Sequence, residues 1–82
     1  KIISPNANGV YFSEKNSRQE IELRASGTTQ TKYLYWYLND HWIGKYPANA
    51  RTFIKPNVGQ NKISCTDEAG KTVSVVFEMR EM

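Results

Sequence analysis

Residues 32–46 read KYLYWYLNDHWIGKY, and this stretch decides the fold class. In its first half, side-chain types alternate so that successive residues point to opposite faces of a β-strand. One face carries the large apolar side chains of Leu34, Trp36 and Leu38, and the opposite face carries three tyrosines. Asn39 and Asp40 then interrupt the pattern, and both residue types tolerate the positive φ angles of a tight turn. The stretch therefore predicts a β-hairpin with a central strand at residues 32–38.

The same alternation continues on both sides of this hairpin. Residues 20–25 read EIELRA, which predicts a half-buried strand with Ile21, Leu23 and Ala25 turned inward. Residues 61–66 and 72–79 predict a second hairpin around a turn at 67–71. In that hairpin we expect Ile63 and Cys65 to face Val73, Val75 and Phe77. Shorter strands are expected at residues 2–5, 10–12 and 52–54, the first two as edge pieces.

Short strands about ten residues apart, with no helical spacing between them, are typical of an antiparallel sandwich or small barrel. We therefore expect an all-β chain, an immunoglobulin-like antiparallel β-sandwich of about seven short strands. Trp36 should anchor the core, because it is in phase with its apolar neighbours on the central strand. The predicted core consists of Ile21, Leu23, Leu34, Trp36, Leu38, Ile63, Cys65, Val73, Val75 and Phe77.

The composition indicates one small folded domain. With 82 residues the chain is long enough for one core and too short for two, so we expect a single accessory domain over residues 1–82. Its hydrophobic content of 39% and charged content of 23% place it with globular proteins rather than disordered segments. The chain begins at Lys1 without an initiator methionine, so we expect a fragment of a longer protein.

The charge pattern bears on the possible partners. The net charge is +3, but the basic residues are scattered along the chain and never form a run, so nucleic-acid binding is not expected. No apolar stretch approaches the ~20 residues of a membrane span, and we expect no membrane contact by this fragment. The one cysteine, Cys65, excludes an intrachain disulfide.

The sequence supplies few groups for catalysis. His41 lies beside the predicted turn and Cys65 falls on the inward phase of its strand, so we do not expect them to form a base and nucleophile pair. Residues 69–72 read AGKT, but a phosphate-binding loop needs a glycine five residues before Gly70 and a helix after it. One histidine and one cysteine also cannot supply the usual ligands of zinc. We therefore predict no catalytic residue, no metal site and no cofactor.

The tyrosine stripe is the candidate binding feature. Tyr33, Tyr35 and Tyr37 should line the outer face of the central strand if Trp36 points inward, and Trp42 or Tyr46 could extend that face or take part in cross-strand packing instead. Amphipathic rings of this kind are enriched at binding surfaces. The alternative is simple cross-strand packing, since tyrosine favours strands and covers its neighbours well. Lys32 and Lys45 could add a basic rim suited to an acidic partner or an anionic wall polymer.

Three stretches resemble one known family. They are residues 2–12 (IISPNANGVYF), residues 35–44 (YWYLNDHWIG) and residues 59–77, which contain an Asp-x-x-Gly turn at 67–70. Together they resemble the C-terminal immunoglobulin-like domain of type-1C bifunctional penicillin-binding proteins, over nearly the whole chain. Asp40 stands where that family usually has a turn glycine, and Cys65 stands where a larger aliphatic residue is common.

The resemblance implies a non-catalytic domain in an extracytoplasmic, periplasmic location, as part of a membrane-anchored parent enzyme. That parent would be a peptidoglycan glycosyltransferase and transpeptidase. The fragment has neither the Ser-x-x-Lys nor the Lys-Thr-Gly motif of such transpeptidases, and its single Ser-x-Asn match, Ser4-Pro5-Asn6, stands without them. We expect it to pack on the catalytic domains of the parent chain or to dock another cell-envelope protein. The alternative is a glycan-binding module that contacts peptidoglycan through exposed aromatic residues.

Overall fold

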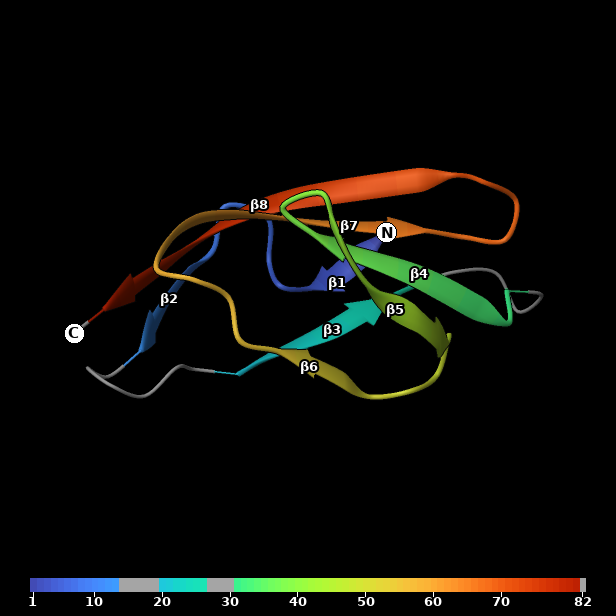
Figure 1. Ribbon diagram of the computed structural model, residues 1–82, viewed down its shortest axis with the longest axis horizontal. Coiled ribbons are helices and arrows are strands. Elements are labelled where there is room, and N and C mark those ends of the chain that lie inside the picture. Colours follow the sequence, from blue (N-terminus) through green and yellow to red (C-terminus); the bar gives the residue numbers. More distant parts are fainter. Residues whose placement is uncertain (14–19, 27–30, 82) are drawn as a thin grey trace.

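The computed structural model describes residues 1–13, 20–26 and 31–81. Within these residues the chain forms eight strands, where the sequence predicted about seven (Figure 1). They are β1 (Ile2–Ser4), β2 (Val10–Ser13), β3 (Ile21–Ala25), β4 (Tyr33–Leu38), β5 (His41–Pro47), β6 (Thr52–Ile54), β7 (Gly59–Thr66) and β8 (Thr72–Glu81). No helix in the described part of the chain is long and apolar enough to cross a membrane.

The strands form two sheets that lie one over the other, with β3 and β6 in one layer and β4, β7 and β8 in the other (Figure 1). The small sheet has the order β1-β3-β6, and the large sheet has the order β2-β8-β7-β4-β5. Strand β4 is therefore an inner strand of the large sheet, between β7 and the edge strand β5. This position gives β4 one face toward the core and one face toward solvent.

One strand pair departs from the antiparallel arrangement that the sequence predicted. β2 runs parallel to β8, with Val10 opposite Glu78 and Phe12 opposite Arg80. The first strand, β1, pairs antiparallel with β3 in the other sheet. The chain thus changes sheets between Ser4 and Val10, over a segment that contains Pro5 and the left-handed residue Asn8 (φ 60°). Because β2 still runs in the direction of β1 after this crossover, it meets β8 in parallel.

The core lies between the two sheets and contains the residues that alternation turned inward. Seven of the ten predicted core residues are buried, namely Ile21, Leu23, Leu34, Trp36, Ile63, Cys65 and Phe77. The other three, Leu38, Val73 and Val75, are partly buried and pack against that cluster. Ile2, Ile54 and Met79 complete the buried set. Only 2% of the Trp36 surface is exposed, so this ring fills the middle of the sandwich.

The turn chemistry follows the residue types. Asn39 and Asp40 both have positive φ, 51° and 69°, as a two-residue hairpin turn between β4 and β5 requires. At the other end of the large sheet, the Asp67 carboxylate accepts hydrogen bonds from the N–H groups of Ala69 and Lys71. Gly70 there has a φ of 86°, which favours glycine. The AGKT stretch is therefore part of a β-turn between two strands.

Candidate docking surface

Alternation along β4 puts its tyrosines on the solvent side of the large sheet. Leu34 and Trp36 point into the core, so Tyr33, Tyr35 and Tyr37 point outward. Tyr33 is 40% exposed, whereas Tyr35 and Tyr37 are half-buried by their neighbours on the sheet. The outer side of an inner strand thus carries three rings in a row.

A β-bulge in the neighbouring strand adds a fourth ring. Tyr35 lies opposite Lys45 and Trp36 opposite Gly44, but Tyr37 lies opposite Trp42 rather than Ile43. The extra residue shifts the phase of β5 by one position, so that Trp42 joins the tyrosines outside while Tyr46, beyond the bulge, packs against the core. Trp42 is 57% exposed. The sequence did not determine which face of the sheet carries Trp42, and the bulge places its ring on the solvent side.

Trp42 contacts two of the tyrosine rings, and Lys45 links Tyr33 to this group. The Trp42 ring centroid lies 5.5 Å from that of Tyr37 and 6.0 Å from that of Tyr35. The Lys45 ammonium lies 4.5 Å from the Tyr33 ring centroid and 5.8 Å from that of Tyr35, within the range of cation–π attraction. We call this group of five residues, Tyr33, Tyr35, Tyr37, Trp42 and Lys45, the aromatic face.

Hydroxyl groups border the aromatic face on the side of β7 and β8. Tyr37 lies opposite Ser64, whose hydroxyl is 2.8 Å from that of Ser74. In the next row Tyr35 lies opposite Thr66, whose hydroxyl is 2.8 Å from that of Thr72. An apolar centre with a polar border is the arrangement found at protein–protein interfaces.

The edge of the aromatic face is held by a carboxylate from the β7–β8 turn. The Glu68 side chain accepts hydrogen bonds from the N–H groups of Lys32 and Tyr33, at 2.7 and 3.0 Å. These bonds lower the pKa of the Glu68 carboxyl below its ordinary value of 4.5, and the nearby Lys32 and Lys45 charges add to the effect. The turn thereby fixes the start of β4 and the position of Tyr33.

His41 and Cys65, which the sequence analysis considered as a base and nucleophile pair, lie apart in the structure. His41 is the exposed first residue of β5, opposite Leu38, whereas Cys65 is buried and lies opposite Trp36. Burial raises the pKa of the Cys65 thiol to about 11, so the thiol stays protonated at neutral pH and acts as a small apolar group. Among the described residues, no cluster of three or more His, Cys, Asp or Glu side chains could hold a metal ion.

The sequence matches one family along nearly its whole length. The Penicillin-Binding Protein C-terminus Family covers residues 1–77. The chain belongs to this family. It is an accessory domain of a cell-envelope penicillin-binding protein, and the resemblance seen in the three sequence stretches is confirmed.

A solved structure confirms the fold class. The chain is similar to a structure described as "Structures of Clostridium thermocellum CbhA fibronectin(III)-like modules", with a TM-score of 0.66. The alignment covers 99% of this chain and 96% of that chain, at 19% identity. The similarity therefore shows an immunoglobulin-like sandwich fold and nothing further. A comparison with curated proteins gives no match.

Proposed function

We propose that this penicillin-binding protein C-terminal domain docks on a protein surface through the aromatic face. The partner is the set of catalytic domains of the parent chain or another cell-envelope protein. The observation that carries the proposal is a cluster of four rings on the solvent side of a sheet, one of them 57% exposed. Clustered exposed rings with a polar border are typical of interaction sites.

Ring orientation favours a protein partner over a glycan strand. A sugar stacks on the flat face of an aromatic ring, so a glycan strand needs several exposed and nearly coplanar rings. Here the Tyr35 and Trp42 planes meet at 39° and the Tyr37 and Trp42 planes at 68°, while Tyr35 and Tyr37 are half-buried. A protein surface, with side chains of varied shape, fits such an uneven array better.

The proposal also covers the parent protein and its compartment. A periplasmic location and a membrane-anchored parent with peptidoglycan glycosyltransferase and transpeptidase activity are part of this proposal, and membership of the family supports them. The domain itself would contribute position rather than chemistry. Within its described residues, the buried thiol of Cys65 and the exposed His41 are in different surroundings and do not form a catalytic pair.

Substitution of Trp42 tests the docking role. Trp42→Ser removes the most exposed ring of the aromatic face and leaves the core untouched. We expect at least about tenfold weaker association with the separately expressed catalytic region of the parent, measured by calorimetry, because exposed tryptophans often dominate interfaces. The matched control is Phe53→Ser, which removes a 47% exposed ring from the other sheet and should leave association unchanged.

Two results would contradict the proposal. Equal association of wild type and Trp42→Ser would show that the aromatic face is not the docking surface. A loss of binding to purified peptidoglycan fragments in Trp42→Ser, with association to the catalytic region unchanged, would establish the glycan-binding alternative instead.

A further inference from the structure

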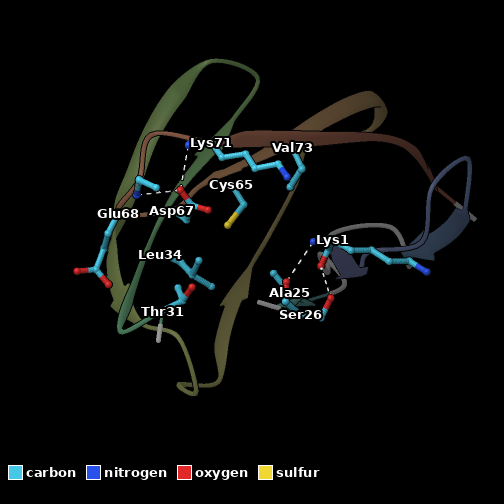
Figure 2. Close-up of a pocket in the computed structure, with 11 residues that line it drawn as sticks. Lys1, Ala25, Ser26, Thr31, Leu34, Cys65, Asp67, Glu68, Lys71 and Val73 are labelled. Carbon is cyan, nitrogen blue, oxygen red and sulfur yellow. Dashed lines mark hydrogen bonds between the residues drawn. The ribbon is translucent and has the colours of Figure 1, made fainter. Parts of the chain in front are cut away.

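A pocket lies at one end of the sandwich, where the two sheets separate. Its walls come from the end of β3, the start of β4 and the β7–β8 turn (Figure 2). The volume is about 760 Å³, within the range of small-molecule sites. Its lining consists of Lys1, Ala25, Ser26, Thr31, Leu34, Cys65, Asp67, Glu68, Ala69, Lys71 and Val73, and includes no member of the aromatic face. We call it the loop-end pocket.

The floor of the loop-end pocket is apolar. The Cys65 side chain points into its centre, between Leu34 and Val73 (Figure 2). Leu34 and Cys65 belong to the buried core, and Ala25 and Val73 are half-buried at the wall. Because the pKa of the Cys65 thiol is raised by burial, the thiol is neutral and adds to this apolar floor. A ligand here would place an aliphatic group against the core.

The charged side chains that line the pocket differ in whether they already have a bonding partner. Asp67 accepts two backbone hydrogen bonds within its own turn, and Glu68 accepts two from the start of β4. The Glu68 carboxylate also points away from the pocket centre (Figure 2). Lys71, by contrast, makes no ion pair with any described residue, and its side chain extends beside Val73 (Figure 2). Lys1 also lines the pocket, but its N-terminal ammonium donates to the Ser26 carbonyl at 3.1 Å and its side chain extends away from the pocket centre (Figure 2). The Lys71 ammonium is therefore the cation that the pocket leaves for a ligand.

We propose that the loop-end pocket binds a small aliphatic monocarboxylate, with the Lys71 ammonium on the carboxylate and the aliphatic body against Leu34, Cys65 and Val73. A short aliphatic peptide with a free C-terminus has this chemistry. The charge complementarity with Lys71 and the apolar floor carry the proposal. It stands apart from docking through the aromatic face, because the two sites share no lining residue.

A matched pair of peptides tests this site. The probe is N-acetyl-Ala-Val-Ala with a free C-terminal carboxylate, and its control is the same peptide with a C-terminal amide. We expect the carboxylate peptide to shift the NMR signals of the Leu34, Cys65 and Val73 amides and to bind about tenfold more tightly than the amide, because the carboxylate makes a charge-assisted hydrogen bond.

A lysine pair supplies the protein control. Lys71→Met should weaken binding of the carboxylate peptide to the level of the amide. Lys55→Met, at an exposed lysine outside the pocket lining, should leave binding unchanged. Equal binding of the two peptides, equal loss in the two variants, or no shift below about 10 mM peptide would overturn the proposal. Because Trp42→Ser alters neither the floor nor Lys71, it should bind the carboxylate peptide like wild type.

Discussion

Two tryptophans of one hairpin show how surroundings decide what a residue does. Trp36 is 2% exposed and belongs to the buried cluster between the sheets. Trp42 is 57% exposed and contacts only the outer side of the sheet through Tyr35 and Tyr37. Removing a buried ring creates a cavity in addition to losing the burial of apolar surface, whereas removing a ring that is more than half exposed opens no cavity and loses much less buried surface. The first tryptophan stabilises the domain, and the second is free to contact a partner.

Alanine substitutions at both positions should therefore differ sharply. We expect Trp36→Ala to lower the free energy of unfolding by about 3–5 kcal/mol, a large part of the stability of a domain this small. Trp42→Ala should cost at most about 1 kcal/mol, since it loses only ring contacts at the surface. Chemical denaturation of both variants measures the difference. A Trp36→Ala variant that melts cooperatively with little loss would show that another residue anchors the core.

At the scale of elements, the sequence predicted the positions and faces of the strands more successfully than the way in which neighbouring strands pair. The period-two alternation of Leu34, Trp36 and the tyrosines is a local property, and it placed the faces of β4 correctly. The bulge in β5 is not local, because it depends on how β5 is matched to β4 across the hairpin. The one residue in the sequence that hints at the bulge is Gly44, because a Cβ at this position would lie 2.7 Å from the Tyr46 ring. The parallel pairing of β2 likewise depends on a crossover between sheets that alternation does not show.

The same limit applies to the loop-end pocket. Its lining residues run from Lys1 to Val73 and come from the four strands β3, β4, β7 and β8 and the segments beside them, so their proximity follows from the packing of the two sheets. Sequence reasoning identified Cys65 as buried and residues 67–71 as a turn, but had no means of placing Ser26 or Thr31 beside them. The aromatic face could be anticipated because three of its members share a single strand.

The hydrogen bonds of Glu68 join two elements and make their association depend on pH. The folded protein lowers the Glu68 pKa below 4.5, so protonation is harder in the folded state than in the unfolded state. The resulting stabilisation is present above the unfolded pKa and is lost as pH falls through the folded pKa. We expect Glu68→Gln to be less stable than wild type at pH 7, with the gap closing as the pH falls below 4.5 and through the folded pKa of Glu68. Thermal melts of both proteins across this range measure it.

A constant gap between wild type and Glu68→Gln across that range would contradict this assignment. The comparison is specific to Glu68, because the other carboxyl pKa lowered among the described residues, that of Glu78, arises from Arg80 and is unchanged in the variant. The effect of Glu68→Gln should be largest at the start of β4. Amide exchange of Tyr33 is expected to quicken in Glu68→Gln, since its N–H loses a charged acceptor.

At the scale of the whole molecule, the sandwich offers two broad faces to a partner. The described residues span 41 by 19 by 19 Å, so one broad face is comparable in size to the about 800 Å² that each partner buries in a standard interface. The outer side of the small sheet exposes Ile3 and Phe53, at 46% and 47%. Strand β3 lies between them, and its Glu22 is bonded to Arg51 at 2.8 Å. That face is divided by an ion pair, whereas Tyr35, Tyr37 and Trp42 form a contiguous group of rings with Lys45 and Tyr33 beside it.

This difference predicts which side of the domain is covered in the full-length parent protein. Hydroxyl-radical footprinting with mass spectrometry reports the solvent exposure of individual side chains in the assembled protein and in the isolated domain. We expect Trp42 and Tyr33 to become severalfold less reactive in the full-length protein, because a contiguous apolar patch is more favourable to bury than a divided one that would strip water from an ion pair. Ile3 and Phe53 should react equally in both, which makes them internal controls on the same domain. Protection of Phe53 with unchanged Trp42 would place the interface on the small sheet and leave the aromatic face exposed for another ligand.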